Sequence, residues 1–137
     1  MNRQHFQKIA LLRAQEARIL LDARQYAGAY YLIGYAIECA LKACVAKQVK
    51  RYDFPDKKIA IEAFTHDIEK LIRVAGLTLE LDTARKTNPA LDLNWAIVKD
   101  WSEAVRYELG ITEAQAKDIY SASVGKNGIL PWVRKKW

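Results

Sequence analysis

The chain has 137 residues, a length typical of one domain with its own hydrophobic core. Hydrophobic residues make up 51% of it and charged residues 28%, which excludes a disordered or low-complexity chain. No unbroken apolar run approaches the roughly 20 residues that cross a bilayer, and the first residues enter a charged helical pattern without a signal peptide. We therefore expect a single cytoplasmic domain over residues 1–137, with no membrane partner.

The net charge of +6 is unevenly distributed along the chain. Residues 1–58 carry eleven Lys and Arg against five Asp and Glu, whereas residues 59–137 carry eleven of each. Much of the excess gathers at Lys47, Lys50, Arg51, Lys57 and Lys58. Such asymmetry can attract phosphate-bearing partners, but a solvated basic loop is common, so charge alone leaves nucleic-acid binding open.

Taken in chain order, residues 3–23 form the first predicted helix, because apolar residues recur there at helical spacing. After a break at Arg24 and Gln25, a second helix is predicted from Tyr26 to about Lys50. It is apolar on nearly every side, which is typical of a helix in the middle of a bundle. Gly28 and Gly34 each lower its helix propensity by roughly 1 kcal/mol, a loss that close approach of a neighbour would offset.

One narrow polar line runs along this second helix. Tyr31, Tyr35, Glu38 and Lys42 are spaced so that they share one face. Cys39 and Cys44 project about 140° apart around the same axis, so we expect neither a disulfide nor a shared metal ion, but two buried thiols.

The second half of the chain predicts shorter helices. Residues 51–64, with Pro55, read as an irregular connection. A helix over 66–75 is predicted with Thr65 as its N-cap and Gly76 after its end, and another short helix is predicted within 77–87.

Two further helices complete the predicted fold. Asn88-Pro89 opens a helix that we expect to run to Leu109, with Trp95 and Trp101 as core anchors. The residues Thr112–Gln115 read as a capping box for the last helix, which Gly125, Gly128 and Pro131 should kink or interrupt. The predicted fold class is all-α, an up-down bundle of four to five main helices.

Four stretches together resemble the HEPN family (higher eukaryotes and prokaryotes nucleotide-binding). They are Tyr26-Ala-Gly-Ala-Tyr-Tyr-Leu-Ile-Gly-Tyr-Ala-Ile-Glu-Cys-Ala-Leu-Lys-Ala43, Thr65-His66-Asp67-Ile68, the segment from Trp101 to Arg106-Tyr107, and the terminal helix. The resemblance implies a helical bundle that is frequently a homodimer and associates with nucleotides or RNA. Many bacterial and archaeal relatives are encoded beside minimal nucleotidyltransferases, as toxin–antitoxin pairs or accessory subunits, and others are metal-independent ribonucleases.

The ribonucleases of this family use an Arg and a later His that are separated by four to six intervening residues. Arg supplies a cation for the phosphorane, and His manages the proton of the 2′-hydroxyl. After Arg106 the corresponding positions are Ile111, Thr112 and Glu113. This departure favours binding over catalysis. If the chain is an enzyme, Arg106 and His66 are the catalytic candidates.

The candidate ligand-binding residues form a composite polar site, contributed by Tyr31, Tyr35, Glu38, Lys42, His66, Arg106 and Tyr107. In the functional interpretation, Lys42 and Arg106 meet phosphate, while His66 or Tyr107 meets a base or ribose. In the structural interpretation, Glu38 and Lys42 belong to a buried network and the tyrosines pack in the core. Nothing in the sequence requires a cofactor or a metal ion.

The first hypothesis is therefore a non-catalytic HEPN-type module that binds a nucleotide, RNA or a nucleotidyltransferase partner. The alternatives are an endoribonuclease toxin with a degenerate motif and a structural dimerisation domain.

Overall fold

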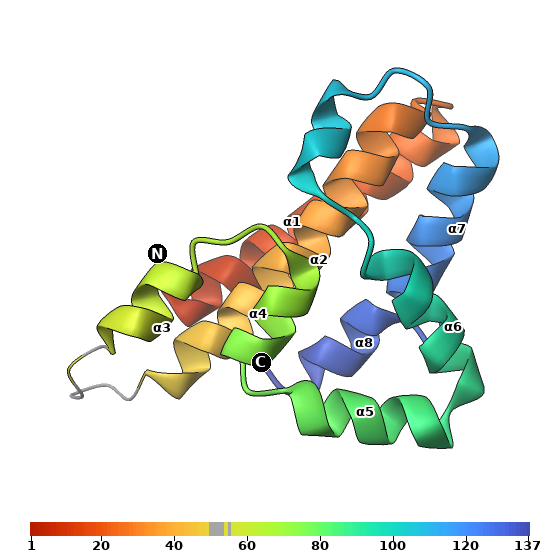
Figure 1. Ribbon diagram of the computed structural model, residues 1–137. Coiled ribbons are helices and arrows are strands. Elements are labelled where there is room, and N and C mark those ends of the chain that lie inside the picture. Colours follow the sequence, from red (N-terminus) through yellow and green to blue (C-terminus); the bar gives the residue numbers. More distant parts are fainter. Residues whose placement is uncertain (50–53, 55) are drawn as a thin grey trace.

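The computed structural model describes residues 1–49, 54 and 56–137, and all regular secondary structure in these residues is helical (Figure 1). The elements are α1 (Arg3–Asp22), α2 (Tyr26–Gln48), α3 (Lys57–Glu62), α4 (Ile68–Val74), α5 (Thr78–Thr87), α6 (Pro89–Val98), the 3-10 helix η1 (Glu103–Tyr107), α7 (Glu113–Val124) and α8 (Ile129–Arg134). The all-α class is confirmed, with more and shorter helices than predicted. Three residues discussed above, namely Lys50, Arg51 and Pro55, lie outside the described residues.

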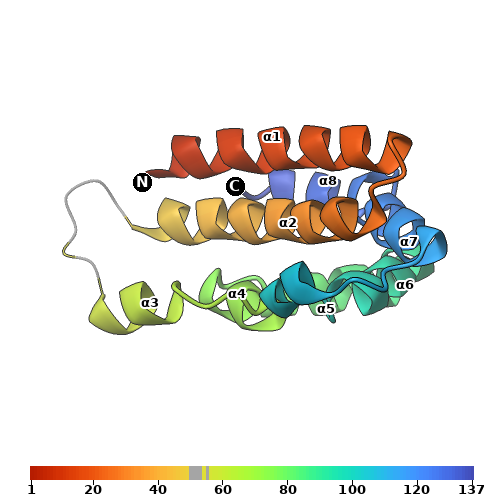
Figure 2. The same cartoon turned by 90° about the horizontal axis from the view of Figure 1, so that it is seen from above.

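Helix α2 is the centre of the fold. Figure 2 shows α1 along one side of it and the row from α3 to α6 along the other. Twelve of its 23 residues are buried, more than in any other described helix, as its apolar circumference predicts. By length and composition α2 could also cross a membrane, but 67% of its most apolar window is buried by other parts of the chain. Packing inside the bundle accounts for its hydropathy.

The predicted helix from Pro89 to Leu109 is wrong beyond Val98. Helix α6 ends there, and the chain turns so that Trp101 is buried, with only 2% of its surface exposed. The hydroxyl of Ser102 then accepts a hydrogen bond from the amide of Ala104 and starts the separate helix η1. Burial of a large indole against α2, together with a new N-cap, offsets the helical hydrogen bonds that are lost at this turn.

Two local details also differ from the prediction. Asp67, not Thr65, is the N-cap of α4, because its carboxylate reaches the amide of Lys70 at 3.0 Å. Helix α3 lies within the segment that we expected to be irregular, and its N-cap Asp56 accepts a hydrogen bond from the amide of Lys58. A helix this short is stabilised mainly by its cap and by side-chain packing. It contains too few turns to be predicted from the apolar periodicity of the sequence.

The structure confirms the predicted sequence signals at several other helix ends. Asn88 caps α6 with Pro89 in the first turn, and Thr112 and Gln115 form the reciprocal capping box of α7. Gly76 follows α4 with a φ of 72°, a conformation that favours glycine. The last predicted helix is interrupted between Val124 and Ile129, which separates α7 from α8.

Candidate ligand-binding site

The carboxylate of Glu38 lies at the centre of the predicted polar site, and it is buried, with 1% exposure. Its Oε1 accepts a hydrogen bond from Lys42 Nζ at 2.8 Å and lies 3.0 Å from Nδ1 of His66. Its Oε2 is also buried but has no hydrogen-bond partner among the described residues. Both contacts therefore fall on one oxygen, and the other oxygen keeps an unused capacity to accept.

His66 connects this buried carboxylate to the surface. Its second ring nitrogen, Nε2, lies 3.2 Å from the carboxylate of Glu103 in η1. Asp67, Glu69, Asp100 and Glu103 all line the shallow cleft beside it, where Lys99 is the single Lys or Arg of the described lining. Both nitrogens of the ring are thus engaged, and the acidic surroundings disfavour a phosphate at His66.

Three aromatic rings form a row next to this polar group. The ring of Tyr31 stacks on the rings of Tyr35 and Trp101, with both centroid separations at 6.1 Å. Tyr31 and Tyr35 are half-buried, whereas Trp101 is buried. Both rings pack against the core, as the structural interpretation expects, while part of each side chain stays accessible.

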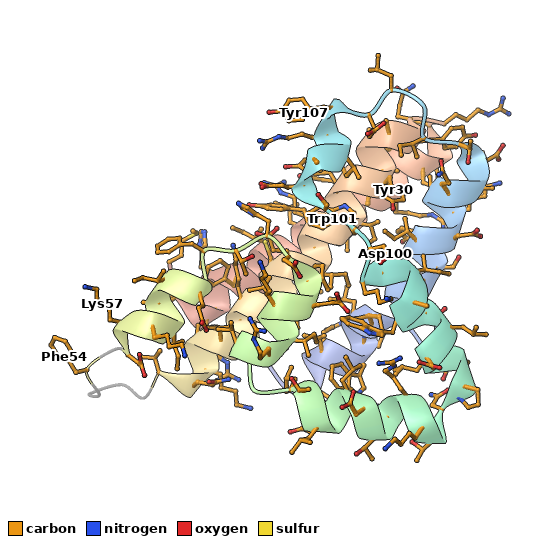
Figure 3. The ribbon with its side chains drawn as sticks, viewed as in Figure 1. Tyr30, Phe54, Lys57, Asp100, Trp101 and Tyr107 are labelled. Carbon is orange, nitrogen blue, oxygen red and sulfur yellow. The ribbon has the colours of Figure 1, made fainter. Side chains whose placement is uncertain are left out.

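Arg106 and Tyr107 continue the row onto the surface. The guanidinium of Arg106 lies 4.9 Å from the ring centroid of Tyr107, which is 74% exposed. Figure 3 shows Trp101 directed toward α2 and Tyr107 at the outer end of η1. Among the described carboxylates, none forms an ion pair with Arg106. Interaction with the side chain of Tyr107, and to a smaller extent with that of Tyr31, raises the pKa of Arg106.

The predicted composite site therefore divides into two parts. The inner polar group consists of Glu38, Lys42 and His66, and the outer aromatic cluster consists of Tyr31, Arg106 and Tyr107. Tyr35 lies between them, because it stacks on Tyr31 and also lines the cavity that the inner group faces. Arg106 forms no ion pair with Glu38; Lys42 pairs with this carboxylate, and Nδ1 of His66 lies beside the same oxygen.

A cavity of about 490 Å³ lies beside the inner polar group, between the start of α1, the second half of α2 and α3. Its lining is mostly apolar and includes Phe6, Tyr35, Cys39, Val45, Ile59 and Phe64. Glu38, Lys42 and His66 also line it. The sequence could not reveal this cavity, because its outer wall belongs to the segment for which no helix was predicted.

The two thiols do not contribute reactive groups to the site. Burial raises the pKa of Cys39 to about 11, and burial likewise raises the pKa of Cys44 to about 11. Both are free, as expected from their spacing on α2. In the residues that the structure describes, no group of three or more His, Cys, Asp or Glu could hold a metal ion.

Comparisons of the chain with protein-family models, with curated proteins and with solved structures gave no significant match. The likeness to the HEPN family therefore rests on the sequence motifs alone.

Proposed function

We propose that this chain is a non-catalytic, HEPN-type binding module that takes a nucleotide or single-stranded RNA at the outer aromatic cluster. The observation that carries the proposal is the state of Arg106. Its guanidinium is exposed, lies over the ring of Tyr107, and has no acidic partner among the described residues. An unpaired guanidinium beside accessible aromatic rings suits a phosphate together with a stacked base.

In this proposal each residue of the cluster has its own role. Arg106 contacts phosphate, while the exposed face of Tyr107 stacks on a base. Tyr31 supports the arrangement from α2, since its ring packs on Trp101 and its side chain interacts with Arg106. The engagement of His66 by two carboxylates supports binding over cleavage, because a general base needs a nitrogen that can reach the substrate.

The HEPN resemblance adds a nucleotidyltransferase as a protein partner for the same surface. A protein partner and RNA differ in their dependence on salt. Phosphate contacts release counterions, so RNA affinity falls steeply as salt concentration rises. The dependence of affinity on salt concentration therefore distinguishes an RNA ligand from a protein partner.

The test is a titration of the purified protein with a single-stranded RNA and with nucleoside triphosphates. Binding is monitored by fluorescence anisotropy or by calorimetry. Arg106→Ala and Tyr107→Ala should each weaken binding about tenfold, since each removes a charged or stacking contact of roughly 1–3 kcal/mol. Arg134→Ala is the matched control, because Arg134 also lies over an aromatic ring, that of Trp137, but on α8. Equal losses in all three variants, or no binding at low salt, would contradict the nucleic-acid version.

A further inference from the structure

The ring of His66 lies between two carboxylates that come from different parts of the chain. Its Nδ1 is 3.0 Å from Oε1 of Glu38 on α2, and its Nε2 is 3.2 Å from Oε2 of Glu103 on η1. A neutral imidazole has one N–H, so it would turn a lone pair toward one of these oxygens. The imidazolium has an N–H on both nitrogens and attracts both carboxylates. The geometry around the ring therefore suits its protonated form.

The charged and titratable groups around His66 come from several segments of the chain. On the side of the shallow cleft the described groups are Asp67, Glu69, Lys99, Asp100 and Glu103. On the side of the cavity they are the amino group of Met1, Tyr35, Glu38, Cys39, Lys42 and Asp56. Of all these groups, only Glu38 and Glu103 form ion-pair contacts with the ring in the described structure. A change in the charge of His66 therefore acts first on these two carboxylates.

Glu103 lies in the same short helix as Arg106, the residue that carries the proposed contact with phosphate. In a 3-10 helix, side chains at positions i and i+3 lie on the same side, which places Glu103 and Arg106 next to each other. Glu103 contacts His66 instead and forms no ion pair with Arg106 among the described residues. The pKa of Arg106 is raised chiefly by Tyr107, and the charge of Glu103 adds to that rise. Glu103 is therefore close enough to pair with Arg106 once its contact with His66 is lost.

We propose that the charge of His66 controls the access of phosphate to Arg106. When the ring is protonated, it holds the carboxylate of Glu103 toward α2 and leaves the guanidinium of Arg106 free. When the ring loses its proton to solvent, Glu103 is released and pairs with Arg106 in competition with phosphate. His66 is thus a positioning residue of the outer aromatic cluster, and the cluster binds more tightly at mildly acidic pH. This inference rests on the proposed function, because it concerns the regulation of the same site.

The experiment measures the affinity for a single-stranded oligouridylate between about pH 5.5 and pH 8. Histidine side chains change charge in this range, whereas the phosphodiesters and the uracil bases do not. The parent protein should bind about threefold to fivefold more tightly at the lower pH, the ratio expected when one exposed ion pair no longer competes.

Two substitutions should remove this pH dependence in opposite ways. Glu103→Gln removes the competing carboxylate, so it should bind at the higher pH as tightly as the parent protein binds at the lower pH. His66→Gln releases Glu103 permanently, so it should bind at the lower pH as weakly as the parent protein binds at the higher pH. A general loss of structure cannot produce the tighter binding of Glu103→Gln.

His5→Gln is the matched control, because His5 is the only other histidine of the chain and is exposed on α1. This variant should keep the pH dependence of the parent protein. A pH dependence of affinity that survives in His66→Gln or in Glu103→Gln would overturn the inference.

A measurement without ligand separates this inference from the proposed function. In NMR spectra of the free protein, the Nε–H resonance of Arg106 should shift with pH together with the ring resonances of His66, and Glu103→Gln should abolish that shift. If the coupled shift is present but no RNA binds, the proposed function is wrong and the control of Arg106 by His66 stands. If RNA binds but the Arg106 resonance does not follow the His66 ring, the inference is wrong and the proposed function stands.

Discussion

The indole of Trp101 lies directly on the backbone of Gly34, so that a Cβ atom at position 34 would fall 2.1 Å from Nε1. Two non-bonded heavy atoms cannot lie so close together, and the buried ring has little room to move aside. This contact joins the turn after α6 to the central helix and thereby fixes where η1 starts. It explains why a helix as long as α2 contains a glycine in its middle.

The first prediction follows from that contact. Gly34→Ala should lower the free energy of unfolding by at least about 2 kcal/mol, because overpacking outweighs the gain in helix propensity. Gly28→Ala is the control, since its Cβ would meet only the end of the Leu20 side chain at 3.1 Å. That variant should stay within about 1 kcal/mol of the parent protein in urea unfolding. Similar stabilities for the two variants would contradict the packing described here.

The second prediction concerns the ion pair beneath the cavity. Lys42→Ala removes the cation that neutralises Glu38, whose carboxylate is 1% exposed, and should destabilise the fold by about 3–5 kcal/mol. The double variant Glu38→Gln with Lys42→Met should be clearly more stable than Lys42→Ala, because it leaves no buried charge. Lys117→Ala removes an exposed partner of Glu113 and should change stability very little.

The third prediction concerns the reactivity of the cysteines. Because burial raises the pKa of Cys39 and of Cys44 to about 11, both side chains are protonated thiols below that pH. At pH 8 only about one part in a thousand of each would be thiolate, so a disulfide reagent should react slowly with the folded protein. The rate should rise with pH toward 11, and both thiols should react at once in denaturant. Rapid labelling of the folded chain at pH 8 would show that the thiols are accessible.

The fourth prediction separates binder from enzyme. The purified protein should cleave little or no RNA in a metal-free buffer. It has no histidine at the position where the family's ribonucleases have one, and general acid–base catalysis by such a residue contributes about 10²–10⁴-fold. Arg106→Ala should weaken binding, and His66→Ala should alter stability through Glu38. Cleavage that both substitutions abolish, while the variants remain folded, would instead establish the degenerate-motif ribonuclease.

The fifth prediction concerns assembly. We expect a homodimer, as the HEPN resemblance implies, and the 97% exposure of Leu109, two residues after Tyr107, supports a contact near the end of η1. Leu109→Glu should then shift the dimer toward monomer in sedimentation at tens of micromolar protein. Leu79→Glu is the matched control, because Leu79 is 81% exposed on α5. A strict monomer for the parent chain at that concentration would refute this expectation.

The features that the sequence alone predicted correctly depend on residues that lie close together in the chain. The apolar circumference of α2, the caps at Asn88 and Thr112, and the shared face of Tyr31 and Glu38 all depend on helical periodicity or on side chains three or four positions apart. Because these interactions are local, they can be predicted from a short segment of sequence, and the structure confirms them.

Only the tertiary structure decided the remainder, because it depends on contacts between residues far apart in the chain. The end of α6 at Val98 follows from the burial of Trp101 on Gly34, which lies 67 positions earlier in the chain. The two contacts on Oε1 of Glu38 need His66 to come from another element, and the cavity beside them needs α3 to form its outer wall. Periodicity assigns a residue to a face of its helix, whereas the packing of several helices determines what that face meets.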